Sequence, residues 1–335
     1  MSIDKAVVAI VTTILIISSG VVAESGKKYR SVIAEPTEGD YVEFDVDLSG
    51  MFQAFIDDPE MEVKDVENNI RPTFSMTYHG NSCINLPPSE CSRTVISSAF
   101  NFTLIHDDES ETYDDDTIMS MSMVITSEDA GGVGWIESTL TTDAWLNIAG
   151  EDWHLEMVEV ETGDITYVGS APSEFSVGDT WTLTTESDMI TTSRERLNGG
   201  EWETETTEES WSNTTNYNAE STGAVSSNPG IDTIKLSSQE TGSSAKDVEY
   251  YSEHGIPVKM ETYNEDGDLE MIVTLKEYRY LKLCGSPEPF HGFSAICYGE
   301  PADNGGIMDS LPGFNAIAAV SMIGIATVFP RVSRD

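Results

Sequence analysis

Apolar and polar residues alternate with a period of two through most of this sequence, and this pattern constrains the fold more than any other feature. Between Val42 and Leu48 every second residue is apolar, and the three residues enclosed are acidic. Side chains of a strand point alternately to its two faces, so the pattern predicts a strand with one buried face and one wet face. Comparable runs, rich in Thr, Val, Ile, Tyr and Trp, predict strands at residues 72–78, 93–105, 117–126, 133–147, 153–161, 180–193, 201–207, 231–238, 247–253, 256–263 and 269–281.

Turn residues separate many of these runs, and between residues 36 and 283 helical periodicity allows at most a short helix around residues 51–68. The fold class is therefore all-β: a large antiparallel meander that forms a curved half-barrel or two β lobes, with apolar helices at the two ends of the chain. The polar stretch 186–228 predicts long, solvated hairpin arms. Turns are predicted at Gly131-Gly132, Ala149-Gly150, Gly163-Asp164, Asn198-Gly199-Gly200, Glu253-His254-Gly255 and Asn264 to Asp268.

The charge of the chain excludes some partners. Seventeen Lys and Arg residues stand against 59 Asp and Glu residues, which gives a net charge of −42. Nucleic-acid binding depends on cationic side chains and is therefore not expected, and attraction to anionic lipids is disfavoured for the same reason. A hydrophobic fraction of 39% is enough to build a core. We therefore expect the acidic residues on the surface, where they would suit solubility in high salt or the binding of divalent cations.

The first residues have the layout of a secretory signal. An uncharged run from Ala6 to Ala23 ends in small residues, and polar residues follow at once, so we expect cleavage after Ala23. The alternative is an uncleaved transmembrane anchor, because the run is close to the minimum length that spans a bilayer.

The last residues carry a second apolar segment, from Ala316 to Phe329, which follows Pro312-Gly313-Phe314 and precedes two arginines. This order resembles the PGF-CTERM sorting signal of archaeal surface proteins. The resemblance covers about the last 25 residues, and it implies that an archaeosortase cuts near the motif and joins the new end to a lipid. It departs from the family in its short arginine tail and in the lack of a Thr-rich stalk. The two ends together predict an archaeal protein held on the outer face of the cell membrane.

A second resemblance covers residues 175–281. The phrases Phe175 to Trp181, Ile231 to Lys235, Glu249 to Lys259 and Leu275 to Tyr278 are similar to strands of the open half-barrels of periplasmic lipoprotein carriers. That resemblance implies a capacity for apolar ligands and brings no catalytic residue with it.

The repeated phrase Gly-Asp at residues 39–40 and 178–179 opens a strand each time, which favours two lobes; one large curved sheet is the alternative. The expected divisions are a signal peptide (1–23), a first β lobe (24–170), a second, half-barrel-like β lobe (171–283), a disulfide loop and tether (284–311), and the sorting signal with its transmembrane tail (312–335).

Four cysteines in an exported chain predict disulfides, because no pair has the spacing of a zinc site. Three pairings are possible, and we favour the local one: Cys83 with Cys91 and Cys284 with Cys297. Two sequons, at Asn101 and Asn213, predict surface positions that accept glycans.

An acidic run is the first candidate binding site. Seven carboxylates crowd the expected loop after residue 105, and such oxygens could hold Ca²⁺, although a solvated acidic loop is the plainer interpretation. The candidates are Asp107, Asp108, Glu109, Glu111, Asp114, Asp115 and Asp116.

Three methionines, Met119, Met121 and Met123, alternate with serines and so share one strand face, about 6.6 Å apart. Thioethers suit Cu(I), but Ile125 continues the same face, which favours a flexible core or the lining of a ligand groove. Trp135 and Trp145 share a face with acidic residues, which would suit glycan stacking as well as sheet packing.

Signatures of catalysis are absent, and the five histidines are scattered. We therefore expect a non-enzymatic, membrane-tethered protein that binds an apolar or polymeric ligand without a cofactor, apart from possible Ca²⁺. The expected partners are the membrane, the processing enzyme, and a lipid or glycan. The alternatives are an acidic envelope protein bridged by Ca²⁺ in the surface layer and a hydrolase whose site is assembled from distant residues.

Overall fold

The computed structural model describes residues 28–30, 38–57, 62–87, 91–106, 113–130, 132–148, 150–169 and 171–279. Within these ranges the chain is almost entirely β, which confirms the predicted class. The elements are β1 (Tyr41–Asp47), α2 (Ser49–Asp57), β2 (Val63–Tyr78), β3 (Ser92–His106), β4 (Tyr113–Asp129), β5 (Val133–Ile148), β6 (Glu151–Gly169), β7 (Thr180–Leu197), β8 (Glu203–Val225), β9 (Asn228–Glu240), β10 (Lys246–Ser252), β11 (Pro257–Tyr263) and β12 (Leu269–Arg279). The signal peptide, the tether, the sorting signal and both apolar ends lie outside the described residues.

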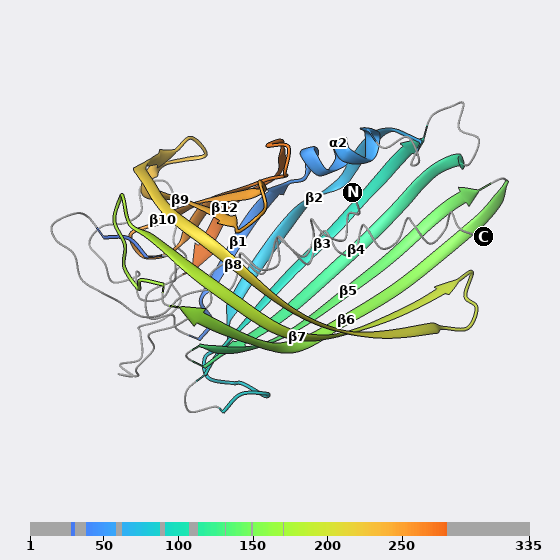
Figure 1. The fold of residues 1–335 in the computed structure, drawn as a ribbon. Helices are drawn as coiled ribbons and strands as arrows, with labels where there is room; N and C mark the ends of the chain where they lie inside the picture. Colours follow the sequence, from blue (N-terminus) through green and yellow to red (C-terminus); the bar gives the residue numbers. More distant parts are fainter. Residues whose placement is uncertain are drawn as a thin grey trace.

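The sheet is closed. Each strand pairs antiparallel with the next, and β1 pairs with β12, for example at Phe44 with Leu275 and at Val46 with Val273. One closed barrel therefore takes the place of the half-barrel or the two lobes that the sequence suggested (Figure 1). The expected boundary at residues 170 and 171 falls between β6 and β7, which pair with each other from Leu155 to Gly169. Closure satisfies the backbone groups that two free edges would leave unpaired.

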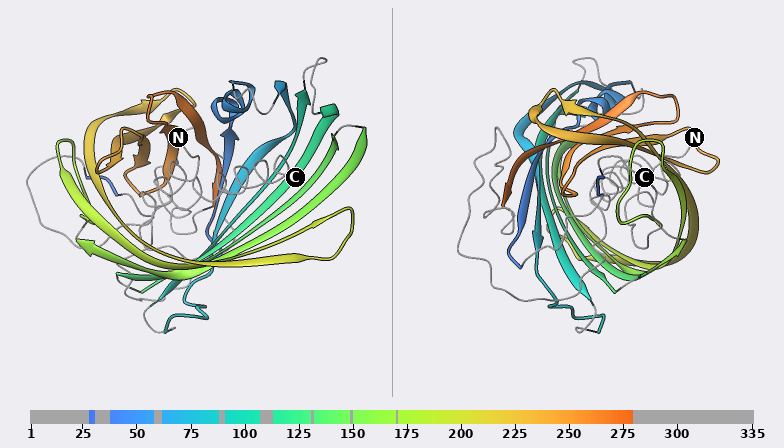
Figure 2. Two further views of the ribbon diagram at one scale, coloured as in Figure 1. Left: turned by 45° about the vertical axis from the view of Figure 1, so that its right-hand side comes forward. Right: turned by 90° about the vertical axis from the view of Figure 1, so that its left-hand side faces the viewer.

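The wall of the barrel is uneven. Strands β2 to β8 have 15 to 23 residues, whereas β1, β10 and β11 have only seven each. Figure 2 shows the long strands sweeping along one side and the short ones gathered at one end. The first part of β8 pairs with β7 but extends beyond β9, which pairs with β8 only from Thr215, and residues 203–210 are exposed on both faces. This is the solvated arm that the polar composition predicted.

The inner face holds the core. Along β5 each second residue is buried, and the same alternation continues on the neighbouring strands. The buried residues form one large apolar cluster, in which Phe74, Phe102, Leu104 and Ile125 are fully buried. The period-two pattern thus sorts residues between the inside of the barrel and solvent.

The first helix is shorter than expected. It ends at Asp57, and β2 already begins at Val63, so residues 63–68 of the predicted helical stretch are strand. The register of β2 against β3 shifts near Asn68, Ile70 and Thr73. These irregularities interrupt the alternation of apolar and polar residues that would have predicted a strand. Helix α2 packs inward, with the ring of Phe52 5.3 Å from that of Phe102. No helix of the described part of the chain is long and apolar enough to span a membrane.

The turn predicted at Gly163-Asp164 is wrong, since both residues lie within β6. A Cβ atom at Gly163 would overlap the carbonyl oxygen of Asp188 and the side chain of Met189 on β7. The glycine therefore permits a close approach of two strands. In contrast, Asn198 and Gly199 form the predicted turn after β7, and both have positive φ, at 49° and 68°.

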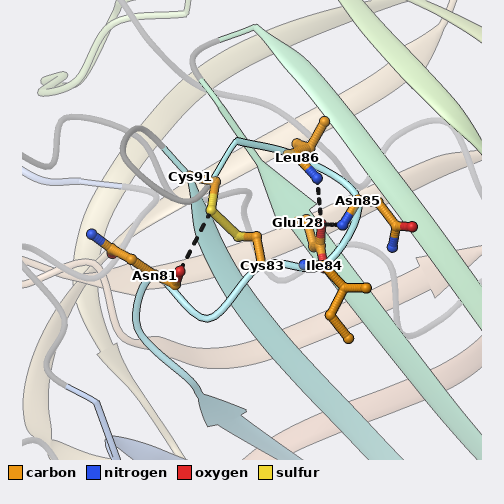
Figure 3. Close-up of a disulfide and its surroundings, with 7 residues drawn as sticks. All are labelled: Asn81, Cys83, Ile84, Asn85, Leu86, Cys91 and Glu128. Carbon is orange, nitrogen blue, oxygen red and sulfur yellow. Dashed lines mark hydrogen bonds between the residues drawn. A yellow bond between two sulfur atoms is a disulfide. The ribbon is translucent and has the colours of Figure 1, made fainter.

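A disulfide between Cys83 and Cys91 closes the loop between β2 and β3, as predicted. Figure 3 shows that Glu128 of β4 points into this loop. Its carboxylate is fully buried and accepts hydrogen bonds from the backbone N–H groups of Ile84, Asn85 and Leu86, at 2.7, 2.8 and 3.0 Å. One side chain thus satisfies three backbone donors that the turn leaves unpaired.

We expect Glu128→Ala to lower the free energy of unfolding by about 3 kcal/mol, because three backbone N–H groups would lose their acceptor. Chemical denaturation with the disulfide intact measures this. The control is Glu137→Ala on β5, an exposed acid that should change stability by less than about 0.5 kcal/mol. Equal effects of the two substitutions would show that Glu128 does not hold the loop.

Candidate functional site

The three predicted methionines line the inner face of β4. Met119, Met121 and Met123 have exposed fractions of 0%, 3% and 0%, and they lie opposite Ala144, Thr142 and Leu140 of β5. All three belong to the large apolar cluster. A thioether side chain has three rotatable bonds and adapts to neighbours of different shape, so these methionines can fill an irregular part of the core.

A second, aromatic cluster occupies the inner face of β7 to β10. Trp181 of β7 stacks on Tyr217 of β8 with ring centroids 5.3 Å apart and planes inclined by 6°. Tyr251 of β10 is buried in the same cluster. Tyr29 and Phe175 pair through their backbones and pack against these rings. The members are Tyr29, Ala171, Phe175, Leu183, Tyr217, Ala219, Ile234, Leu236 and Tyr251, with Tyr167 and Trp181 partly buried at its margin.

Two acids of β10 are buried beside these rings. Asp247 and Glu249 point to the same inner face, with exposed fractions of 6% and 3%. Glu249 lies opposite Leu236 of β9 and Met260 of β11, so it separates the aromatic cluster from the large apolar cluster. Sequence reasoning missed this pair, although Asp247 and Glu249 alternate with Val248 and Tyr250 in a strand that was predicted.

The environment of these acids shifts several pKa values upward. Burial raises the pKa of Glu249 to about 8; nearby Asp247 adds to the shift, and a hydrogen bond with Tyr251 opposes it. Burial also raises the pKa values of Tyr217 and Tyr251 well above the usual range, and the acids of β10 add to both shifts. The folded protein therefore favours a protonated Glu249 near neutral pH.

A similar effect occurs on β6. Glu161 is largely buried, and its pKa is raised to about 7 because of that burial and because Glu159 and Glu209 are close. The side chains of Glu159 and Glu161 are on the same inner face of β6 as those of Leu155 and Met157. The inner face therefore carries acids on both sides of the barrel.

The predicted acidic run lies mostly outside the described residues: this holds for Asp107, Asp108, Glu109 and Glu111. Strand β4 begins at Tyr113, so Asp114, Asp115 and Asp116 belong to a strand and not to a loop. Pairing with β5, at Asp115 with Asn147, extends the strand into the acids. Asp115 and Asp116 are exposed.

The other predicted residues are dispersed. Asn101 is on β3, where its amide donates a 2.7 Å hydrogen bond to the hydroxyl of Ser120, and Asn213 is on β8. Cys284, Cys297, Pro312, Gly313, Phe314 and Ala23 lie outside the described residues.

The outer face of β5 and β6 carries a cluster of polar groups that could offer metal ligands. His154 stacks on Trp145, with ring centroids 4.0 Å apart, and its Nε2 atom lies 3.0 Å from an Asp143 oxygen. Glu156 is adjacent, but both its oxygens accept hydrogen bonds from Arg196, at 2.6 and 2.7 Å. The guanidinium occupies the carboxylate that a metal would need, so the cluster is an ion-pair network.

A hollow of about 560 Å³ lies along β7, β8 and β9. Its exposed lining consists mainly of amides and hydroxyls, including Thr182, Asn216 and Gln239, with Lys246 and Glu220. Thr182 donates a 3.0 Å hydrogen bond to Asn216. Trp181, which is partly exposed, and Tyr217 complete the lining, so the hollow combines hydrogen-bonding groups with a stacked pair of aromatic rings.

Comparison with known proteins leaves the family open. No family model and no curated protein matches this chain. One solved structure that matches is a β-barrel-like protein of the domain of unknown function DUF1849 from Brucella abortus, with 9% sequence identity and a TM-score of 0.34. The match covers 74% of this chain and 98% of that chain. Similarity at this level carries no argument, and none below rests on it.

Glu249 makes the stability of the barrel depend on pH. Its pKa is higher in the folded protein than the ordinary 4.5, so stability falls as the pH rises from about 4.5 to about 8. We expect Glu249→Gln to remove this contribution, so that the variant gains a few kcal/mol relative to the wild type between these pH values. Urea denaturation at a series of pH values measures the difference. Glu203→Gln on the exposed arm should give a constant difference, and a constant difference for Glu249→Gln would contradict the burial of a neutral acid.

Proposed function

We propose that this protein is a non-enzymatic, exported archaeal surface protein whose barrel binds an apolar, lipid-like ligand on its inner face. The observation that carries the proposal is the closure of twelve strands around an apolar inner face. The diameter of a barrel grows with the number of its strands, and eight strands already enclose space for packed side chains or one small ligand. Twelve strands enclose a wider interior, which a ligand can complete.

The chemistry of the inner face supports an apolar ligand. Methionines from β4, β6, β11 and β12 contribute to the large cluster, and their side chains can repack around guests of different length. These methionines are Met119, Met121, Met123, Met157, Met260 and Met271, and the cluster also contains Met51 of α2 and Met189 of β7.

Export and anchoring are the second part of the proposal. Residues 1–23 supply the signal, and Pro312-Gly313-Phe314 with the tail behind them supply the sorting signal by their resemblance to PGF-CTERM proteins. The disulfide between Cys83 and Cys91 fits an oxidising compartment. The lipid-modified end would hold the barrel at the outer face of the membrane, close to a source of apolar molecules.

A second candidate function is an acidic envelope protein that packs into the surface layer, bridged by Ca²⁺. The exposed acids of the β8 arm favour it: Glu203, Glu205, Glu208 and Glu209. This function requires no ligand inside the barrel, so ligand binding distinguishes the two.

Ala144→Phe should reduce binding of an apolar probe, because Ala144 is fully buried opposite Met119 and a ring there would fill the inner space. We expect the full chain to enhance the fluorescence of an apolar dye at one site per barrel, with the affinity lowered at least about tenfold in the variant. Circular dichroism checks that the variant is folded.

The matched control is Thr141→Phe, which adds the same ring to the exposed face of β5. Equal dye binding by the two variants would place the dye outside the barrel, and an unresponsive wild type would contradict the proposed function.

Intact-mass measurement of the protein from the membranes of its own host tests the anchoring. We expect a chain that lacks residues 1–23, ends near Pro312 and carries the added mass of a lipid. Replacing Pro312, Gly313 and Phe314 by alanine should leave the tail in place, while Asp309→Asn should not affect processing. A wild-type chain that retains its unmodified tail would refute this part of the proposal.

A further inference from the structure

The hollow along β7, β8 and β9 is large enough for a small ligand. Its volume of about 560 Å³ is within the range of pockets that bind small molecules. Exposed side chains line it, among them Thr182, Asn216, Gln239 and Lys246. Leu183, the neighbour of Thr182, is buried in the inner aromatic cluster, so the alternation of the strand directs the exposed residues to the outer face. The hollow is therefore separate from the apolar interior.

The strand register places these four exposed residues in one row. Thr182 lies opposite Asn216, Asn216 lies opposite Gln239, and Gln239 lies opposite Lys246. Neighbouring strands are about 4.8 Å apart, so the row crosses from β7 to β10 over about 14 Å. A ligand in the hollow can therefore contact four strands if it is elongated and lies across them.

Hydrogen bonds fix both amide side chains of the row. Asn216 accepts a 3.0 Å hydrogen bond from the hydroxyl of Thr182 and donates one of 3.1 Å to the hydroxyl of Thr241. Gln239 donates a 2.9 Å hydrogen bond to the backbone carbonyl of Ser243. Each amide has two N–H groups and a carbonyl oxygen with two lone pairs, so each retains a donor and an acceptor for a ligand. Side chains that are already held lose little further freedom on binding.

Aromatic rings support the row. Lys246 lies over the ring of Tyr263, with its Nζ atom 5.0 Å from the ring centroid, and its ammonium group adds N–H donors at the β10 end. Trp181 and Tyr217 complete the lining, and their stacked rings give it a rigid base. The hollow is thus preformed, with hydrogen-bonding groups held along its length.

The lining disfavours several classes of ligand. Among the described residues it contains one carboxylate, that of Glu220, which is bound to Lys235 at 2.6 Å, whereas a divalent cation needs several oxygen ligands. One lysine in a chain with a net charge of −42 does not suit a nucleic acid. A hydrocarbon would take water from the amides without replacing its hydrogen bonds. The ligand that fits is uncharged and carries many groups that both donate and accept hydrogen bonds.

We infer that this hollow binds a short, neutral oligosaccharide that lies across β7 to β10. Sugar hydroxyls both donate and accept hydrogen bonds, so they match the amides of Asn216 and Gln239. A chain of linked sugars presents such hydroxyls repeatedly along its length and can follow the row. This site is on the outer face, and it does not depend on the apolar ligand proposed for the inside of the barrel.

Saturation-transfer NMR on the full chain tests the inference with four neutral trisaccharides: mannotriose, maltotriose, cellotriose and chitotriose, each at about 10 mM. We expect at least one of them to bind, with a dissociation constant of about 1 mM or lower. Trigalacturonate is the acidic comparison. It should bind more weakly than the best neutral sugar, because the protein is strongly acidic.

The double variant Asn216→Leu, Gln239→Leu removes the donors and acceptors of both amides and should lower the affinity for the neutral sugar at least about tenfold. The matched control is Thr204→Leu, Thr206→Leu, which replaces two exposed polar residues of β8 outside the hollow and should bind as the wild type does. Circular dichroism verifies that each variant is folded. The apolar dye should bind both double variants equally, because neither changes the inner face.

Failure of every neutral trisaccharide to bind the wild type overturns the inference, and so does binding that survives the loss of both amides. An equal loss in the control variant would place the sugar outside the hollow. Stronger binding of trigalacturonate that Lys246→Met abolishes would assign the hollow to an acidic ligand instead. None of these results changes the test of the proposed function, which depends on dye binding inside the barrel.

Discussion

The pairing of β1 with β12 is the interaction on which the rest of the structure depends. Both strands are short, yet their backbone hydrogen bonds join the two ends of a twelve-stranded sheet. The ion pair between Glu43 and Lys276 connects residues 233 positions apart on the outside of the same seam. An open sheet would leave unpaired backbone groups along its two edges. Closure removes the inner face from water, and the burial of the core and of the inner acids follows from it.

Closure gives the inside of the barrel two kinds of chemistry. The large cluster of Met, Phe, Leu and Val residues gains stability from burial of apolar surface. Glu249 of β10 opposes it, because burial of a carboxyl group with an unsatisfied oxygen costs free energy.

Much of the fold follows from local patterns. Alternation located the strands, and Asn198-Gly199 and the cysteines near Pro87 marked a turn and a stapled loop. The predictions that were wrong or missing concern single residues and short segments. Gly163 resembles a turn residue, but its role is to let β7 come close, and only the neighbouring strand reveals this. The first residues of β2 were not predicted as strand, because their register against β3 is irregular and interrupts the alternation. The role of Glu128 could not be predicted from the sequence. It is one of 59 acidic residues, and its three backbone partners lie in a loop more than forty residues earlier in the chain.

By itself, the sequence determined which segments become strands, where several of them turn, and that one face of each strand is polar, and it favoured the pairing of Cys83 with Cys91. These features depend on residues within a few positions of one another. Only the tertiary structure decided that the sheet closes, that the methionines and the acids of β10 share its inside, and that the Lys and Arg residues of β7 to β12 lie on its outer face. Closure joins residues from opposite ends of the described chain, and the burial that raises the pKa of Glu249 comes from strands that alternation alone cannot place around it.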